Sequence, residues 1–581
     1  MALSTVSSDT DTLALLGKKQ VLKRRFGFWS LFGFAVCELI TWETVLALFS
    51  QGFDNGGPAG LIYGFIIAWS STLSVYTVIS ELASLAPIAG GQYYWVYMLA
   101  PPKWKVFSSY IIGWLTSLAW VATVATETIF AGTMLQGLVI LDHSDYNSSL
   151  LWRGTFLAWA VLLVCVLVNV IVPGMLPKFE VFIIIFHISG FIAIVATLWA
   201  TAPHSSSHFV WSTALNEGGW PTQGLSYCVG FLGNVATFVG ADASVHLAEE
   251  VAHAAKNIPR AIICSMCLNG AVGFIMMITI LYCLGDVDSV LSTTTGYPFI
   301  QVFAIQNTAG ASVMVAVVLC LTWACAIGIT TTASRMTWSF ARDKGTPFSH
   351  VLGKVAKHNQ VPIIAACAVA ALAGLLHLIY IGSSVAFNDV VSLTITGFYS
   401  SYFLPAIMLL YRRVKGQIGD YTPPNPTTLE GASYDPEKGN NDNSGGITEP
   451  VDEKSAQDDN IGATNFPPSD PAVGNTYDHH RVSVAQATLI WGPFHLPGWI
   501  GIINNAYACS YMIFVIFWSV WPPTTPVTSE TMNYSVVVTG GVIIFSIIWY
   551  FIRGRHEYHG PLIDDEVAKI MRRDSIVQVE G

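Results

Sequence analysis

The stretch GLSYCVGFLGNVATFVGADASVHLAEEV (224–251) combines an almost uncharged run with a cluster of titratable side chains at its end. The cluster consists of four residues at positions i, i+4, i+7 and i+8, namely Asp242, His246, Glu249 and Glu250. On a helix this spacing places all four side chains on one face. Glycines interrupt the apolar part of the stretch at 230, 233 and 240. The stretch therefore predicts a membrane-buried helix that is broken along its length and carries charge at its inner end.

The composition of the whole chain is that of a membrane protein. Hydrophobic residues make up 53% of the 581 residues and charged residues only 11%, whereas soluble domains carry about a quarter charged residues. Apolar runs of roughly 20 residues, each long enough to cross a bilayer, recur along most of the length. We therefore predict an all-α polytopic membrane protein that lies in a lipid bilayer. The net charge of −10 lies mostly in loops and tails and does not indicate nucleic-acid binding.

Twelve transmembrane spans account for the apolar runs. They are expected at 27–52, 58–80, 107–138, 151–172, 178–201, 222–246, 260–284, 309–334, 361–382, 387–411, 498–520 and 533–553. An even number of spans places both termini on the same side. Of the 27 Lys and Arg residues only Arg153 falls on the other side, and basic residues gather on the cytoplasmic side. Both termini are therefore predicted to be cytoplasmic, and two glycosylation sequons, at Asn147 and Asn533, fall on the outer face.

Composition divides the chain into five segments. They are a cytoplasmic tail at 1–26, a core of ten spans at 27–411, an acidic insert at 412–486, two further spans at 487–553 and a cytoplasmic tail at 554–581. The insert cannot bury a core and is expected to be disordered; a linker, a regulatory segment and a retained intron are all open explanations for it. No phosphate-binding loop and no metal-ligand cluster is indicated. We therefore expect no cofactor, no metal and no enzyme activity.

Spans 1 and 6 are interrupted at corresponding positions of two five-span halves. Span 1 carries Glu38 and Glu43 within its apolar run, and span 6 carries the glycines and the titratable cluster. Such a pair of interruptions indicates a transporter site, because broken helices offer free N–H and C=O groups at the membrane midplane. Between spans 2 and 3, residues 81–102 are too interrupted to span and too apolar to be solvated. We predict a helix–turn–helix at the cytoplasmic interface there, with its turn between Pro87 and Gly91.

Several motifs resemble the amino acid–polyamine–organocation superfamily. FVGADASVHLAEEVAHAAKNIPRAI (238–262) resembles its sixth-span signature, and NGGPAGLIYG (55–64) and SELASLAPIAGGQYYW (80–95) resemble its motifs after spans 1 and 2. SFARDK (339–344) and GPFHLPG (492–498) are similar to its fungal branch, the GABA and choline permeases. The resemblance implies a 5+5 inverted repeat, spans 1–5 and 6–10, with two accessory helices. It also implies secondary transport of amino acids or small amines, usually coupled to protons.

The resemblance also implies where a substrate binds. The candidates on the interrupted parts of spans 1 and 6 are Thr41, Trp42, Glu43, Thr44, Thr237, Phe238 and Gly240, with the unwound part of span 1 at Thr41–Thr44. Glu43 is expected either to bind a cationic substrate group or to pair with another protein residue. Two further candidates, Trp120 and Trp323, would complete an aromatic cage for a quaternary ammonium group together with Trp42 and Phe238. The alternative for these rings is ordinary packing.

Three titratable side chains inside the spans are candidates for proton coupling, namely Asp242, His187 and Glu127. Ionisable residues inside a membrane are costly to bury, so they are expected to face a cavity or a partner. The alternative role of Asp242 is a structural hydrogen bond to span 1, and that of His187 is a satisfied core position. At the cytoplasmic exit, Glu249, Glu250 and Arg260 are expected to form an ion-paired gate with Lys256 or with the loop between spans 2 and 3.

These features together predict a proton-coupled importer of an amino acid (GABA-like) that works by alternating access around a midplane site. A choline or polyamine carrier is the first alternative, and a non-transporting nutrient receptor is the second. The expected partners are a small-molecule substrate, protons and lipid, and the oligomeric state is left open. The plasma membrane is the expected location, with the vacuolar membrane as the alternative.

Overall fold

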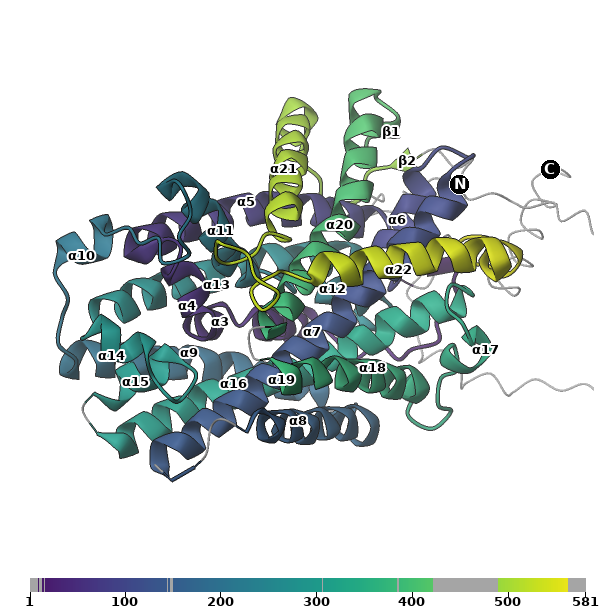
Figure 1. The fold of residues 1–581 in the computed structure, drawn as a ribbon. Helices are drawn as coiled ribbons and strands as arrows, with labels where there is room; N and C mark the ends of the chain where they lie inside the picture. The colour runs from purple at the N-terminus through teal and green to yellow at the C-terminus, as the bar shows by residue number, and fades with distance from the viewer. Residues whose placement is uncertain are drawn as a thin grey trace, which may run out of the picture.

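Packed helices make up most of the described part of the computed structural model of the protein (Figure 1). The structure describes residues 9, 13, 14, 16–143, 145, 146, 150–305, 307–383, 386–421 and 489–562. Within these residues, 11 helices are long and apolar enough to cross a membrane, and the only two strands have two residues each. The all-α class that the sequence predicts is confirmed.

The long helices follow the predicted spans to within a few residues at most ends. They are α2 (Phe28–Leu39) with α3 (Thr41–Ala47), α5 (Gly57–Leu85), α7 (Lys105–Asp142), α8 (Leu151–Ile171), α9 (Leu176–Thr201), α13 (Ala254–Tyr282), α16 (Thr308–Arg342), α18 (Ile363–Leu376) with α19 (Leu378–Gly382), α20 (Ala386–Val414), α21 (Gly498–Trp518) and α22 (Ser535–Trp549). Span 6 is not among the eleven, because it is split into α11 (Gln223–Ala236) and α12 (Ala243–His246). With this broken span included, all twelve predicted segments are present.

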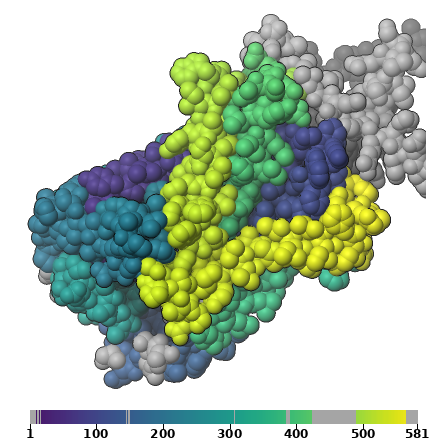
Figure 2. All heavy atoms as spheres, turned by 45° about the horizontal axis from the view of Figure 1, so that its top comes forward, coloured from purple at the N-terminus to yellow at the C-terminus, as the bar shows by residue number. Residues whose placement is uncertain are grey.

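Shorter helices connect the long ones. They are α4 (Phe49–Phe53), α6 (Gln92–Leu99), α10 (Ser207–Ser212), α14 (Val287–Leu291), α15 (Pro298–Ala304), α17 (Ser349–Leu352), α23 (Arg555–Glu557), the 3-10 helix η2 (Ala248–Glu250) and the π-helix η6 (Tyr550–Gly554). α10, α14 and α15 lie at one end of the bundle and α17 lies at the other (Figure 1). The last two long helices lie on the outside, with α21 alongside α20 and α22 running at an angle to both (Figure 2).

The first span is broken at Ile40, whose φ is 28°. Asn269 of α13 bridges the break, because its Nδ2 donates to the Val36 carbonyl at 3.3 Å and its Oδ1 accepts from the Thr41 N–H at 3.4 Å. Buried backbone groups need such partners, so this side chain stabilises the interruption. Thr41–Thr44, predicted to be unwound, are the first residues of α3, and that prediction is wrong. The break falls one residue earlier, at an isoleucine that carries no local signal for it.

The sixth span is interrupted between α11 and α12. Gly240 has a φ of 114°, a conformation open mainly to glycine. The Tyr76 hydroxyl accepts hydrogen bonds from the N–H groups of Gly240 and Ala241 at 3.2 and 3.3 Å. A Cβ at position 240 would lie 3.0 Å from the Glu38 carbonyl oxygen. The two interruptions therefore meet at this glycine, as the sequence predicts for a broken-helix site.

The helix–turn–helix predicted after span 2 is present. α5 continues to Leu85, a turn follows in which Gly91 has a φ of 51°, and α6 begins at Gln92. The turn packs on the second half of span 6, where His246 Nδ1 donates to the Ala89 carbonyl at 2.8 Å. Most residues of this segment are buried within the protein rather than exposed at the membrane–water interface, so the segment helps to close the bundle at this end.

A small parallel pair of strands joins the two ends of the acidic insert. Ile418–Gly419 (β1) pairs with Leu489–Ile490 (β2), and the Trp491 N–H donates to the Gly419 carbonyl at 3.0 Å. Disorder is expected over the whole insert, 412–486. That expectation is wrong for residues 412–421, which include the end of α20 and β1, and residues 422–486 lie outside the described residues. The pairing fixes the ends of α20 and α21 relative to each other.

An epitope tag placed in the insert, near residue 455, is expected to be accessible to antibody only after the cells are permeabilised. The reason is the charge distribution, since Lys and Arg gather at the end of the bundle from which the insert leaves. A matched tag in the loop after α7 should label intact cells. Labelling of the insert tag on intact cells would contradict the predicted orientation.

Candidate functional site

A small cavity of about 30 Å³ lies between the broken spans and the long helices α7, α16 and α20. Its lining residues are Glu38, Leu39, Thr44, Leu48, Thr123, Thr126, Glu127, Phe130, Ala236, Val239, Ile329, Val391, Thr394 and Ile395. Two are acids and four are threonines, and none of these described lining residues is basic. We call this space the central cavity. It has room for one or two water molecules, so a larger molecule can enter only when its walls move.

A second cavity of about 490 Å³, the vestibule, lies next to the central cavity. Leu48 and Phe130 line both spaces, so these two side chains form the partition between them. The vestibule is polar, and its acidic lining residues are Asp54, Glu217 and Asp389. No lysine or arginine is among the described residues that line it. The two spaces therefore form an acidic path that ends at the broken helices.

Glu38 is the acidic side chain closest to the break in span 1 and lies in the wall of the central cavity. Its side chain is 2% exposed, and neither carboxylate oxygen has a hydrogen-bond partner among the described residues. Gly328 of α16 makes room for it, since a Cβ there would lie 2.0 Å from Glu38 Oε1. The sequence shows this acid within an apolar run, yet the site prediction rests on Glu43 and omits Glu38.

Glu43 lies away from the central cavity, against span 5. Its Oε1 is 2.8 Å from His187 Nδ1, and both side chains are fully buried. The structure thus brings together two residues that the sequence predicts separately, one as a substrate ligand and one as a proton carrier. Glu43 has the alternative role named for it, that of an acid paired within the protein.

Asp242 is held by a network that joins three segments. Its carboxylate accepts from Gln92 Nε2 of α6 at 2.8 Å and from Tyr402 Oη of α20 at 2.5 Å. His246 Nε2 lies 3.6 Å away, one turn further along span 6. The side chain is fully buried and does not line the central cavity. Asp242 therefore connects the second half of span 6 to α6 and to α20.

Of the predicted substrate-binding residues, only Thr44 lines the central cavity, where the coupling candidate Glu127 joins it. The residues outside the lining are Thr41, Trp42, Glu43, Trp120, Thr237, Phe238, Gly240 and Trp323. The proposed aromatic cage is not assembled: Trp42 packs on His187, Trp120 on Phe398 and Phe238 on Phe65. Among the ring contacts of the described residues, none joins two of the four cage candidates. Residue spacing within single helices could not predict against which neighbouring helix each of these rings packs.

Two buried ion pairs join the end of span 6 to α16. Arg342 Nη2 lies 2.7 Å from Glu249 Oε1, and Arg335 Nε lies 2.8 Å from Glu250 Oε1. The predicted basic partner, Arg260, is exposed and pairs with neither glutamate in the described part of the chain. The prediction is right in placing acids here and wrong in their partner, because the arginines come from a helix far along the chain.

Both ends of the described chain meet near these ion pairs. Asp343 pairs with the buried Lys18, accepts from Tyr93 Oη at 2.8 Å and accepts from the Leu562 N–H at 3.1 Å. The N-terminal segment and the C-terminal segment therefore lie on the same end of the bundle. This end is closed, whereas the vestibule is open toward the other.

The two sequons have different outcomes. Asn147 lies outside the described residues. Asn533 is 3% exposed, and its Nδ2 donates to the Ser519 and Trp521 carbonyls at 3.1 Å each. A glycan on that nitrogen would have to displace these buried contacts. The burial of this amide therefore disfavours glycosylation at Asn533.

Comparison with known proteins assigns the family. Residues 26–427 match a family model described as amino acid permease. The chain belongs to this family. The permease is 30% identical over 387 residues to a Macrophomina phaseolina protein named for amino acid and polyamine transport, with 66% of this chain and 85% of that one covered.

Two relatives from Saccharomyces cerevisiae cover most of the permease. Identity to a choline transporter is 26%, with 93% of this chain and 83% of the relative covered. Identity to a GABA-specific permease is also 26%, with 98% and 89% covered. The permease is therefore a multi-pass membrane transporter and not an enzyme.

The acidity of the vestibule leads to a pH-dependence prediction. Burial, together with the nearby Glu217 carboxylate, raises the pKa of Asp54 to about 6. As the pH on the vestibule side falls through 6, Asp54 gains a proton and the vestibule loses one negative charge. The KM for a cationic substrate should then rise by about two- to five-fold, the effect of one partly screened charge. Asp54→Asn should show the higher KM at every pH from 5 to 7, while the exposed control Glu530→Gln should match the wild type. A wild-type pH profile in Asp54→Asn would contradict this role.

Proposed function

We propose that the permease is a proton-coupled importer of a small solute with a cationic amino group, with a GABA-like amino acid as the first candidate. The observation that carries the proposal is the central cavity, where two carboxylates and no basic side chain face the junction of two broken helices. Broken helices at such a junction bind ionic solutes. The vestibule supplies an acidic route to this point.

Alternating access follows from the closures at the two ends. In this structure the vestibule is open and a thin partition of Leu48 and Phe130 separates it from the central cavity. The opposite end is closed by the ion pairs of Glu249 and Glu250. Substrate would pass the partition, become enclosed and then leave when the ion pairs separate. We assign this gate role to the two glutamates, with Arg335 and Arg342 as their partners.

Proton coupling is assigned first to Asp242. Its carboxylate accepts hydrogen bonds from α6 and α20, and a proton on it would weaken the attraction that holds these segments together. Asp242 lies on the same half of span 6 as Glu249 and Glu250, whose ion pairs close this end of the bundle. This shared position supports the assignment. His187, paired with Glu43, and Glu127, in the cavity wall, are the second and third candidates.

A choline or polyamine carrier is the second candidate function. One observation favours it: the backbone N–H groups that a substrate carboxylate would use are already engaged. The Gly240 and Ala241 N–H groups donate to Tyr76, and the Thr41 N–H donates to Asn269. A substrate without a carboxylate needs none of these groups.

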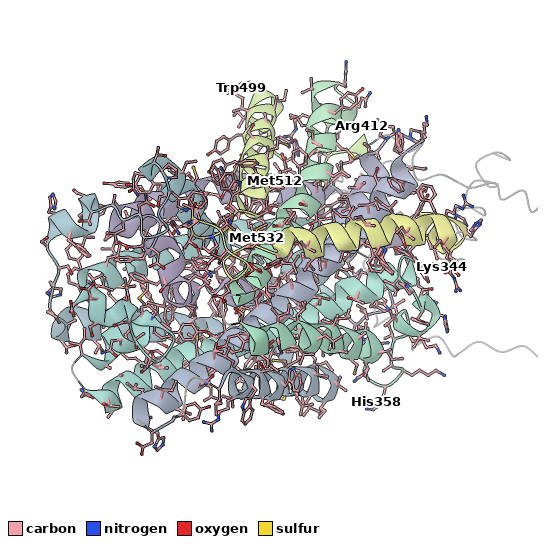
Figure 3. The ribbon with its side chains drawn as sticks, viewed as in Figure 1. Lys344, His358, Arg412, Trp499, Met512 and Met532 are labelled. Carbon is pink, nitrogen blue, oxygen red and sulfur yellow. The ribbon has the colours of Figure 1, made fainter. Side chains whose placement is uncertain are left out.

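We place both termini in the cytoplasm and the protein in the plasma membrane, with the vacuolar membrane as the alternative. Lys344 lies at the α17 end of the bundle (Figure 3), Arg412 Nε donates to the Leu99 carbonyl of α6 at 3.1 Å, and the described chain ends meet at Asp343, next to Lys344. Basic residues favour the cytoplasmic side. The vestibule then faces outward.

Uptake of labelled GABA, choline and putrescine into a permease-deficient yeast strain tests the proposal. Saturable uptake of any of these that grows as the medium is acidified supports a proton-coupled carrier. Preference for GABA supports the first candidate, and preference for choline or putrescine supports the second. A correctly localised permease that takes up none of them would overturn the proposal and favour a receptor role.

A further inference from the structure

The geometry of the central cavity points to a substrate class: we infer that Glu38 and Glu127 bind a protonated amine that still carries N–H donors, and that they discriminate against quaternary ammonium groups. The inference rests on the proposed function, since it concerns the same cavity. It assigns the main ligand role to Glu38 rather than to Glu43.

Glu38 is placed as a ligand and not as a structural ion pair. Its carboxylate is 2% exposed, lines the cavity and has no hydrogen-bond partner among the described residues. A buried carboxylate in this condition is strongly destabilising unless something pairs with it. Gly328 leaves the space that the carboxylate occupies, because any larger residue there would collide with Oε1. The fold thus keeps at this point a carboxyl group without a partner among the described residues, with which a cationic ligand can pair.

Glu127 supplies a second carboxylate from the opposite wall, on α7. It is 9% exposed, and its Oε2 is likewise without a partner in the described part of the chain. Two acids around one small cavity favour a ligand with positive charge. They also leave one carboxylate available for a proton when the ligand carries a single charge.

The threonines of the cavity are arranged as acceptors. The hydroxyls of Thr44, Thr123 and Thr394 donate their protons to backbone carbonyls one turn earlier, at 2.9, 2.8 and 3.1 Å. A hydroxyl whose proton is used in this way can only accept a further hydrogen bond. The fourth threonine, Thr126, has its hydroxyl 3.5 Å from the Thr394 hydroxyl. Three of the four threonine hydroxyls therefore act as acceptors toward a ligand, and the complement of this wall is a group with several donors.

A quaternary ammonium group does not meet this requirement. It has no N–H donor, and proteins bind it on aromatic faces through cation–π attraction. Phe130 is the one aromatic residue among the described lining residues, whereas the tryptophans considered for a cage pack elsewhere. A trimethylated head would leave two carboxylates and the threonine oxygens without partners. Sites built for hydrogen bonding reject such analogues strongly.

The test compares matched pairs of substrates that differ only in N-methylation: ethanolamine with choline, and GABA with its N-trimethyl analogue. We expect the unmethylated member of each pair to have the higher Vmax/KM, by about ten- to a hundred-fold, the value of one or two charge-assisted hydrogen bonds. Equal or better transport of the trimethylated members would overturn the inference while leaving the carrier function intact. Transport of none of the four, nor of putrescine, by a correctly localised protein would overturn both.

Variants make the assignment specific to Glu38. Glu38→Gln keeps the shape and should reduce the preference for unmethylated substrates to within about three-fold, while Glu38→Asp should restore part of it. Gly328→Ala, which forces the carboxylate out of place, should act in the same direction. Gly540→Ala, where a Cβ meets nothing within 4 Å, is the matched control and should behave as the wild type. If Glu38→Gln is correctly localised and keeps the full preference, Glu38 is not the ligand.

Discussion

Replacing Arg335 with alanine is expected to open the end of the permease that the Glu249 and Glu250 ion pairs close, which we place in the cytoplasm, and to abolish accumulation of substrate. Arg335 Nε and Glu250 Oε1 lie 2.8 Å apart, with exposures of only 2% and 4%. Removing one partner of a buried ion pair leaves an unpaired charge, which costs about 3–5 kcal/mol. The closed state would lose that stabilisation, so the ratio of closed to open molecules should fall by at least about a hundred-fold. Reactivity of a cysteine introduced at Ser339, probed from the cytoplasmic side, measures the change.

The proper control for this variant is Arg260→Ala. Arg260 is exposed and belongs to the same charged region, so its loss should leave both cysteine reactivity and accumulation near the wild-type values. The double variant Glu250→Gln, Arg335→Gln removes both charges and should recover part of the closed population. Unchanged reactivity in Arg335→Ala would mean that this ion pair does not hold the cytoplasmic end closed.

Asp242→Asn is expected to exchange substrate across the membrane but to lose accumulation driven by a pH gradient. Asparagine resembles the permanently protonated acid: its oxygen can still accept the hydrogen bond from Tyr402, and its NH2 group can donate to the Gln92 amide oxygen. Thermodynamic linkage requires that if a bound proton raises the affinity for substrate, bound substrate raises the affinity for the proton by the same factor. A variant without the titrating group has lost that coupling, so its accumulation ratio should fall to about one. Measurement of exchange and net uptake in the same cells separates the two effects.

Glu249→Gln serves as the comparison for Asp242→Asn. It weakens the pair with Arg342 at 2.7 Å, so it should alter the rate of transport while uphill uptake remains proton-driven. If Asp242→Asn cells still concentrate substrate with the wild-type pH profile, Asp242 is structural. His187 or Glu127 would then carry the proton.

The hydropathy of the chain and the positions of helix-breaking residues were sufficient to predict the architecture. Membrane spans are long and apolar, so their number and ends follow from composition, and the glycines of 224–251 mark the break in span 6. The position of the break in span 1 could not be predicted in this way. Ile40 has a positive φ, which an isoleucine does not lead one to expect. Hydrogen bonds from the distant residue Asn269 stabilise this conformation.

The candidate site was harder to predict, because it depends on how helices turn about their axes. Glu38 and Glu43 are both acids in span 1, but only Glu38 faces the central cavity, since the chain changes direction at Ile40 between them. The partners of Glu249 and Glu250 come from α16, and no local pattern links them. The Asn533 sequon has the right residue types, yet its amide is buried. Each of these outcomes is set by packing between distant segments.

Transport by the purified permease in liposomes tests the central claim most directly. The protein would be reconstituted with a neutral interior, and an acidic exterior would be imposed in the presence of the best labelled substrate from the uptake panel. A proton-coupled carrier should raise the internal concentration above the external one and lose this accumulation when a protonophore is added. An internal concentration that reaches only the external level, and does so equally with and without the gradient, would contradict the account.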